Sequence, residues 1–373
     1  MSRPRVVIAG LGDIGVLTAI HLARHVDVVG ISSKPEVVSG QEVGVRLARP
    51  DDWAADNRVA FSRYRRLEGV RRVHGSLTGL DPDAREVGVR LADGSESVEP
   101  YDVLVVSTGV TNGFWRTSAL LTSEQVDEQV RTHHERVAAA GSVAVIGGGA
   151  AALSVAANLR IRWPDQRVDL YFPGERALAA HHPRAWAEVR RRLVDLGVGL
   201  HPGHRAVVPD GFAGEAITDA PVAWQGGQPP TVAEAVVWAI GRVRPNTEWL
   251  PAYLLDERGF VAVTPTLQSE RHPEIFAVGD VAATDPQRSS ARNRADRLLA
   301  ANIRAHLAGR PLAPYRATRS RWGSVLGVQD DGLLFLTADG RAIQLPRWLI
   351  ERVLLPWVVR RGFYGGVRRK PSA

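Results

Sequence analysis

The sequence predicts an α/β fold with two Rossmann-like, parallel-sheet units and a small C-terminal unit. Two glycine motifs carry this prediction, and each lies between an apolar run and a stretch of helical character: Gly10-Leu11-Gly12-Asp13-Ile14-Gly15 after residues 6–9, and Gly147-Gly148-Gly149-Ala150-Ala151-Ala152 after residues 143–146. In each motif the first glycines permit a tight turn and bring a phosphate close to the backbone and to the positive end of a helix. Two such motifs in one chain indicate two bound dinucleotides.

Three further apolar runs end in glycine. Residues 103–106 lead to Ser107, Thr108 and Gly109, residues 236–240 lead to Gly241, and residues 274–278 lead to Gly279 and Asp280. A carboxylate in the last of these positions can accept hydrogen bonds from the hydroxyl groups of a ribityl chain, and Gly279 leaves room for a phosphate. This feature is typical of a flavin site, so the predicted pair of dinucleotides is FAD and NAD(P)H.

The order of these motifs resembles that of the two-dinucleotide flavoproteins of the glutathione-reductase-like superfamily, and within it the apoptosis-inducing-factor-like branch. The likeness covers nearly the whole chain and includes the ferroptosis suppressor proteins and, more distantly, type II NADH:quinone oxidoreductases. It implies an FAD-dependent oxidoreductase of the pyridine nucleotide-disulfide oxidoreductase-like type. In such an enzyme hydride passes from NADH or NADPH to the flavin, and electrons then pass to a quinone-like acceptor.

The runs and motifs divide the chain into three parts. A discontinuous FAD-binding domain is expected at residues 1–113 and 244–315, an NAD(P)H-binding domain at 114–243, and a small interface domain at 316–373. The chain has 373 residues, of which 45% are hydrophobic, and exceeds the roughly 250–300 residues at which single cores stop growing. In the first part, Phe61, Tyr64 and Leu67 stand at a spacing of three, which suits a helix packed over the cofactor or a substrate cleft.

The expected FAD contacts come from the first motif and from the strand ends that follow it. They are Gly10, Gly12, Asp13, Ile14, Gly15, Ser32, Ser33, Lys34, Val73, Thr108, Gly109, Gly279 and Asp280. About 20 residues beyond Gly12, where an acid usually binds the ribose, the chain has Ser32. A hydroxyl gives up the charge-assisted hydrogen bond of a carboxylate, so either FAD binds less tightly or Ser32 substitutes with the help of a water.

The expected NAD(P)H contacts come from the second motif and the strands around it. They are Gly147, Gly149, Ala150, Ala151, Ser154, Glu175 and Gly241. Ser154 stands where the resembling family often has a glutamate that positions the nicotinamide. Glu175 would suit a ribose hydroxyl pair, whereas the neighbouring Arg176 would suit a 2′-phosphate. We take NADH as the expected donor, and NADPH stays open.

A helix from about residue 289 to residue 308 is the expected place for groups that act on the chemistry. The resemblance implies that its N-terminus faces the flavin, where the positive helix end stabilises the charge of the reduced form. Arg292 and Asn293 in its first turn would add to that field, and we assign them as the candidate catalytic residues. The alternative is that both side chains face solvent.

The tail at residues 347–361 carries apolar residues at 349, 350, 353, 354, 357 and 358, broken by arginines. One interpretation is a helix on a membrane surface, which would suit a lipid-soluble quinone. The other is a helix buried against its own domain or a homodimer partner and kinked at Pro356. We expect burial, because it is the commoner fate of such a stripe.

Composition excludes several kinds of chemistry. The absence of cysteine excludes disulfides and a redox dithiol, so electrons cannot leave the flavin through a protein thiol. The adjacent histidine pairs at 133–134 and 181–182 lack the spacing of metal ligands on one helix face, so no catalytic metal is expected. No signal segment precedes the apolar run at Val6, and no run approaches the ~18 apolar residues of a membrane span, so a cytoplasmic protein is expected.

The net charge of +7 would suit nucleic acid or an anionic membrane as partner. Arginine supplies nearly all of the basic residues, since only Lys34 and Lys370 are lysines, and compositional bias explains this without a nucleic-acid function. We therefore expect no specific nucleic acid. Two alternative functions stay open: a flavin-dependent reductase or oxidase that uses ferredoxin, oxygen or a biosynthetic small molecule, and a nonenzymatic nucleotide-sensing flavoprotein.

Overall fold

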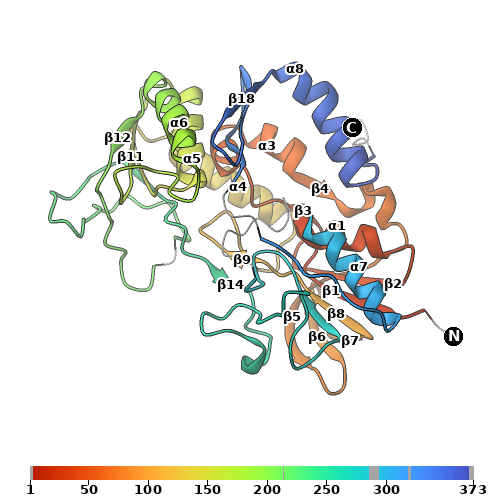
Figure 1. The fold of residues 1–373 in the computed structure, drawn as a ribbon. Helices are drawn as coiled ribbons and strands as arrows, with labels where there is room; N and C mark the ends of the chain where they lie inside the picture. The colour runs from red at the N-terminus through yellow and green to blue at the C-terminus, as the bar shows by residue number, and fades with distance from the viewer. Residues whose placement is uncertain (1–2, 213, 285–293, 318–320, 369–373) are drawn as a thin grey trace.

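The computed structural model describes residues 3–212, 214–284, 294–317 and 321–368. Its first sheet contains β1 (Arg5–Ala9), β2 (Asp27–Ser32), β5 (Arg71–Asp81), β6 (Glu86–Leu91), β7 (Glu96–Pro100), β8 (Val103–Val106) and β15 (Ile275–Ala277). The strand order is β15-β8-β1-β2-β5-β6-β7, parallel from β15 to β5 and antiparallel from β5 to β7. A late segment of the chain thus completes the sheet that its N-terminus begins (Figure 1).

The second sheet repeats the central part of the first. Its strands are β10 (Ser142–Ile146), β11 (Arg167–Tyr171), β12 (Gly199–His201) and β13 (Ala235–Trp238). All are parallel, in the order β12-β11-β10-β13, so β10 lies between its neighbours as β1 lies between β2 and β8. The predicted α/β class with two parallel, Rossmann-like sheets is confirmed.

Alternation along β1 explains how the first sheet is covered on both faces. Successive side chains of a strand point to opposite faces. Val6 and Ile8 pack with helices α1 (Asp13–Leu22) and α7 (Ala295–Leu307), whereas Val7 and Ala9 pack with the segment around Trp249 on the other face. Both faces are fully buried, which accounts for the unbroken apolar runs of these strands.

Helices and short strands connect and cover the two sheets. The helices are α2 (Val43–Ala48), α3 (Pro50–Asn57), α4 (Ser123–Ala138), α5 (Ala150–Arg162) and α6 (Pro183–Asp195), with short 3₁₀ turns at Phe61–Arg63, Arg65–Leu67 and Ala252–Leu254. The short strands are β3 (Glu36–Val38), β4 (Arg58–Ala60), β9 (Val110–Thr111) and β14 (Arg244–Pro245). The chain leaves the first unit at β9 and returns to it at β14. These two strands pair antiparallel, so the two connecting segments lie side by side.

The C-terminal part begins as a three-stranded antiparallel sheet of β16 (Gly323–Gln329), β17 (Gly332–Leu336) and β18 (Ala342–Leu345). Val325 and Leu336 of this sheet share a core with Val155 of α5. A short helix, α8 (Arg347–Leu349), then leads into a π-type helix, η4 (Ile350–Phe363), which descends from α8 toward the C-terminus at the upper right of Figure 1.

The expected helix through Phe61, Tyr64 and Leu67 is wrong. The segment forms two 3₁₀ turns, whose three residues per turn match the observed spacing of three. All three side chains are buried in the core beneath the first sheet, and Tyr64 packs edge-on against Tyr364 with ring centroids 5.2 Å apart. They support the C-terminal tail and do not cover a cofactor cleft.

The expected burial of the tail against its own domain is wrong for three of the six residues of its apolar stripe. Val353, Trp357 and Val358 are 40–58% exposed, whereas Leu349 and Leu354 are half-buried and Ile350 is buried. Trp348 and Phe363, on either side of the stripe, are exposed as well. Ion pairs hold the helix in place without covering this face, as when Arg360 meets Asp56 at 2.8 Å. The tail therefore presents an apolar surface with arginines beside it.

Candidate active site

The two glycine motifs form the same turn in the two units. Gly10 and Gly147 adopt positive φ values of 103° and 141°, which favour glycine. A Cβ atom on Gly10 would lie 2.6 Å from the carbonyl oxygen of Ser107, and one on Gly147 would lie 2.2 Å from that of Ala239. In both units the chain thus passes so close to the end of the neighbouring strand that no side chain fits.

The second glycine of each motif faces open space. Among the described residues, no atom lies within 4 Å of a Cβ atom built on Gly12 or on Gly149. Each of these residues is the N-cap of a helix, α1 or α5, and neither cap makes a side-chain hydrogen bond. The first N–H groups of both helices remain available to an anion, so both turns fit a pyrophosphate.

A cavity of about 570 Å³ opens along the carboxyl ends of β1, β2, β8 and β15. The predicted FAD contacts that line it are Gly10, Gly12, Asp13, Ile14, Ser32, Ser33, Lys34, Thr108, Gly109, Gly279 and Asp280. Two of the predicted contacts do not line it. Gly15 lies behind the turn, against the carbonyl oxygen of Gly10, and Val73 is buried in the sheet as the partner of Ile31. Gly75, Ser76 and Leu77 of the same strand line the cavity instead.

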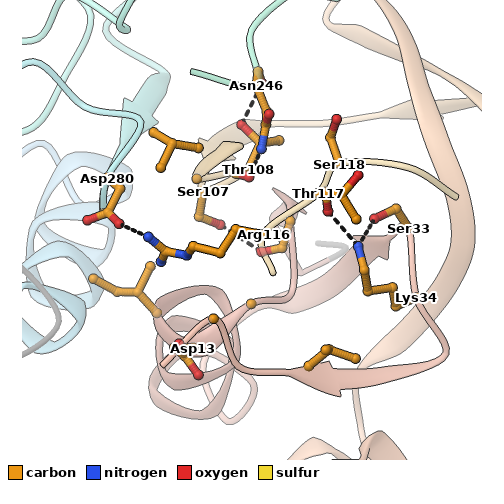
Figure 2. A pocket seen from close by; sticks show the side chains of 18 of the residues that line it. Asp13, Ser33, Lys34, Ser107, Thr108, Arg116, Thr117, Ser118, Asn246 and Asp280 are labelled. Carbon is orange, nitrogen blue, oxygen red and sulfur yellow. Dashed lines mark hydrogen bonds and ion pairs between the residues drawn. The ribbon is translucent and has the colours of Figure 1, made fainter. Parts of the chain in front are cut away.

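Arg116, which was not among the predicted contacts, extends across the cavity. Its guanidinium Nη1 donates to Asp280 Oδ2 at 2.8 Å, as Figure 2 shows. Asp13, the first residue of α1, also faces this cavity and accepts a hydrogen bond from Ser39 Oγ at 3.1 Å. Burial raises the pKa of the Asp13 carboxyl, and the nearby positive charge of Arg116 opposes that rise. The positive charge of Arg116 therefore offsets the negative charges of Asp13 and Asp280 in the predicted flavin site.

Lys34 contributes a second, half-buried cation to the cavity wall. Its Nζ donates to the carbonyl oxygen of Thr117 at 2.7 Å and to Ser33 Oγ at 3.2 Å (Figure 2). Burial, together with the positive charge of Arg46, lowers the pKa of Lys34 to about 8. The Oγ of Ser32 accepts a hydrogen bond from the backbone N–H of Lys34 at 3.2 Å, so this strand end offers a hydroxyl and an ammonium group where the family has an acid.

Arg46 of α2 is a third cation in the cavity wall and, like Arg116, was not among the predicted contacts. It is buried, it donates to the carbonyl oxygen of Trp115 at 3.0 Å, and it lies over the ring of Trp53. Burial, and to a smaller degree the charge of Arg58, lowers its pKa to about 10. Its Nε has no hydrogen-bond partner among the described residues. An unsatisfied buried guanidinium atom in the cavity wall fits an anionic ligand.

Asn246 fixes the edge of the same cavity. Its side-chain amide donates to the backbone carbonyl oxygen of Thr108 at 3.0 Å, and its backbone carbonyl oxygen accepts from Thr108 Oγ1 at 2.8 Å (Figure 2). These bonds join the strand end at Gly109 to the returning chain. No local sequence pattern identifies Arg116, Arg46 or Asn246, because each reaches the cavity from an element far from the glycine motifs.

A second cavity, of about 490 Å³, lies over the second motif. It is lined at the ends of β10, β11 and β13 and after β12 by Ile146, Gly147, Gly148, Tyr171, Pro173, His204, Arg205, Ala206, Val207, Val208, Gln225, Ile240 and Arg242. Of the predicted NAD(P)H contacts, Gly147 lines this cavity and Ala150 lines the first one. Gly149, Ala151, Ser154, Glu175 and Gly241 line neither cavity.

Ser154 is a packing position. Its side chain is buried, and Gly44 of α2 approaches so closely that a Cβ atom on that glycine would lie 2.2 Å from the carbonyl oxygen of Ser154. Asn158 donates to the same carbonyl at 2.8 Å. A glutamate would have no room at this contact between α2 and α5, which explains the serine. Arg292 and Asn293, the candidate catalytic residues, lie outside the described residues.

Two dinucleotide-type turns, each beside its own cavity, define the class of two-dinucleotide flavoprotein oxidoreductases. Residues 4–297 match the family described as Pyridine nucleotide-disulphide oxidoreductase, so the chain belongs to that family. The protein is therefore an FAD-dependent NAD(P)H oxidoreductase, and the predicted cofactors, FAD and NAD(P)H, are confirmed at the level of the family.

Relatives support the same assignment. The chain is 25% identical to the FAD-dependent oxidoreductase FVFD30 of Flammulina velutipes over 64% of this chain and 73% of that protein. It is 22% identical to ferroptosis suppressor protein 1 of Xenopus tropicalis, with 84% and 83% covered. It is 25% identical to the type II NADH:quinone oxidoreductase NdhA of Mycobacterium tuberculosis, with 75% and 66% covered. The expected resemblance to the last two groups is confirmed.

The fold is shared with solved structures. The sulfide:quinone oxidoreductase of Aquifex aeolicus superposes with a TM-score of 0.71 at 17% identity, over 97% of this chain and 92% of that one. This likeness shows the fold. In the described part of the chain, no helix has the length and apolar character needed to cross a membrane.

Proposed function

We propose that the first cavity holds FAD and that the second holds the adenosine and pyrophosphate part of NAD(P)H. Electrons would then leave to a quinone-like acceptor. Residues 1–113 and 244–315 would form the FAD-binding domain, residues 114–243 the NAD(P)H-binding domain and residues 316–373 the interface domain. When bound, the flavin supplies a group that accepts a hydride and gives up electrons. The protein's own residues bind, orient and balance charge.

One observation carries the proposal: Ala150 lines the first cavity although it belongs to the second glycine motif. It is the first residue of α5 and directly follows Gly149, which faces open space. A nicotinamide that extends from the second turn along α5 therefore arrives at the wall of the first cavity. Transfer of a hydride needs this proximity, because the reacting atoms must come within about 3–3.5 Å of each other.

Each group of the first cavity has a proposed role. The N–H groups of α1 after Gly12 bind the pyrophosphate, and Ser32 with Lys34 binds the ribose end. Asp280 accepts hydrogen bonds from ribityl hydroxyl groups, with Arg116 holding its carboxylate in place. The guanidinium of Arg46, which has one unsatisfied nitrogen, donates to an anionic or carbonyl edge of the ligand. Arg292 and Asn293 remain proposed contributors to the field at the flavin.

The acceptor is proposed from the tail and from the absence of thiols. The exposed face that contains Trp348 and Trp357 has arginines 352, 360 and 361 beside it, which suits a helix on an anionic lipid surface. A protein bound to such a surface would have access to a lipid-soluble quinone. Two of the proteins named above are quinone oxidoreductases by name. The chain contains no cysteine through which electrons would leave by a thiol.

The acceptor is tested by reoxidation of the chemically reduced holoprotein, which removes the nicotinamide from the experiment. The reduced protein is mixed anaerobically with a short-chain quinone or a ferredoxin, and separately with oxygen. We expect the quinone to restore the oxidised flavin spectrum fastest. Faster reoxidation by oxygen or by ferredoxin would overturn the quinone assignment and would favour an oxidase or a ferredoxin-linked reductase.

A further inference from the structure

The second cavity is basic. Arg205 and Arg242 line it together with His204, and no aspartate or glutamate is among its described lining residues. Neither arginine has an ion pair or a side-chain hydrogen bond to another described residue. Other arginines of the same unit are paired, as Arg167 is with Asp169 at 2.7 Å. The two lining arginines thus remain available to a ligand with more than one anionic group.

The end of β11 is the position that distinguishes the two nicotinamide dinucleotides. In this kind of fold an acid there binds the 2′-hydroxyl of the adenosine ribose in NADH, and such an acid would repel the 2′-phosphate of NADPH. Here β11 ends at Tyr171 and is followed by Phe172, which is buried against Trp186, and by Pro173. No carboxylate occupies this strand end.

The two neighbouring candidates from the sequence do not reach the cavity. Glu175 is exposed and does not line it. Arg176 donates to the backbone carbonyl oxygens of His181 and Ala179 within its own loop, at 3.3 and 3.4 Å. The carboxylate of Asp169, earlier on β11, accepts a hydrogen bond from His201 at 2.8 Å and pairs with Arg167.

Strand order separates the roles of the two free arginines. Arg205 follows β12, which lies outside β11 and therefore on the adenosine side of the sheet. Arg242 follows β13, on the opposite side of β10, next to the turn at Gly147. The first is placed for a group on the adenosine ribose, and the second is placed for the pyrophosphate. Figure 1 shows β11 and β12 at the outer end of this unit.

We infer that NADPH is the preferred donor, with Arg205 binding its 2′-phosphate and Arg242 its pyrophosphate. This inference rests on the proposed use of the second cavity for the nicotinamide dinucleotide. An arginine binds phosphate through paired, charge-assisted hydrogen bonds, and a site without a carboxylate imposes no repulsion on that phosphate. This inference departs from the NADH preference expected from the sequence.

The test compares two adenosine fragments that cannot transfer hydride. Binding of 2′,5′-ADP and of 5′-AMP to the holoprotein is measured by calorimetry at fixed ionic strength. We expect 2′,5′-ADP to bind at least about tenfold more tightly, since a hydrogen bond to a charged group contributes about 1.5–3 kcal/mol. Arg205→Ala should remove that advantage while changing 5′-AMP affinity less than about twofold, because the 2′-phosphate alone is lost as a partner.

Two further variants sharpen the test. Arg242→Ala should weaken NADH and NADPH binding by similar factors, because the pyrophosphate is common to both. Arg190 is an exposed arginine of α6 that does not line the cavity. Arg190→Ala should therefore leave the affinities for both fragments unchanged. Equal affinity for the two fragments in the parent protein would overturn the inference, as would loss of 5′-AMP binding in Glu175→Ala. Preferential binding of 2′,5′-ADP without any reduction of the flavin would instead count against the proposed function, while the assignment of Arg205 to the 2′-phosphate would stand.

Discussion

The two glycine turns have the same backbone geometry, but the cavities beside them differ in charge and burial. The first cavity has four acidic residues in its wall, Asp13, Glu36, Glu248 and Asp280, and four cations, Lys34, Arg46, Arg116 and Arg321. The second has two arginines and no carboxylate among its described lining residues. The charged groups of the first are mostly half-buried, and several of them are ion-paired, whereas both arginines of the second are exposed and have no ion pair with another described residue.

One supersecondary unit can therefore bind a ligand that stays in place and a ligand that exchanges in every cycle. A preorganised, balanced and buried site suits a cofactor that stays bound, because few groups need to be reordered or desolvated on binding. An open site with free cations suits a substrate that must enter and leave in every cycle. The glycines create the phosphate position in both units, and the neighbouring side chains decide how long the ligand remains.

The largest effect is expected from a carboxylate placed in each turn. Gly12→Asp should purify without FAD, because the side chain would enter the space left for the pyrophosphate and repel it. The matched variant Gly149→Asp should keep its flavin and lose reduction by nicotinamide. Flavin absorbance and far-ultraviolet circular dichroism of both proteins check this, and a yellow, fully loaded Gly12→Asp protein would separate the first turn from the flavin.

A pH dependence of FAD binding is expected from Lys34. Its pKa of about 8 in the absence of ligand means that it is protonated below that pH and neutral above it. The anionic cofactor favours the protonated form, so FAD affinity should fall as pH rises above about 8, by about tenfold to a hundredfold if the charged hydrogen bond is lost.

Lys34→Met is the variant that isolates this effect. At pH 7 its FAD affinity should be lower than that of the parent protein. The fall in affinity between pH 7 and pH 10 that Lys34 causes in the parent protein should be absent from the variant. Titration of the apoprotein with FAD at several pH values measures the profile. Parallel pH profiles for the parent protein and the variant would show that another group controls binding.

The tail should contribute about tenfold to vesicle binding, since burying a large apolar side chain is worth about 1.5–3 kcal/mol when complete. Replacing Trp357 and Val358 with serine should lower binding to anionic vesicles and lower reduction of a long-chain quinone, while sparing a water-soluble quinone. Sedimentation with anionic and neutral vesicles at two salt concentrations measures this. Loss of dimer formation, with no vesicle binding by the parent protein, would identify the exposed face as an interface between copies of the chain.

The smallest effect is expected at Ser32. Ser32→Glu should tighten FAD binding about fivefold, because a charge-assisted hydrogen bond exceeds a neutral one by about 1 kcal/mol. Fluorescence titration of the apoproteins with FAD provides the measurement, and an unchanged or weaker affinity for Ser32→Glu would mean that the Ser32–Lys34 arrangement already satisfies the ribose.

The fold and the phosphate turns were predictable because their signals are local. A glycine motif between a strand and a helix specifies its own turn, and a strand buried on both faces appears as an unbroken apolar run. The charged groups that balance the cavities were not predictable. Arg116 and Arg205 reach their cavities only through tertiary contacts, and each resembles many other arginines in a chain with a basic excess.

Two misjudged segments show the same limit. Phe61, Tyr64 and Leu67 have a spacing that fits a 3₁₀ turn as well as a helix, and only packing against the tail decides between them. The apolar stripe of the tail is compatible with burial. Its exposure depends on how the C-terminal sheet packs against α2 and α5, which is a tertiary contact. Ser154 likewise becomes understandable only when Gly44 is seen against it.

In the proposed reaction, a nicotinamide nucleotide bound in the second cavity transfers hydride to the flavin in the first. The decisive experiment is anaerobic mixing of the purified holoprotein with NADPH, with absorbance of the flavin as the readout. We expect the yellow colour to bleach with NADPH, to bleach more slowly with NADH at the same concentration, and to persist with both nucleotides in Gly149→Asp. A holoprotein that keeps its oxidised spectrum with both nucleotides would contradict the claim and would favour a nucleotide-sensing flavoprotein.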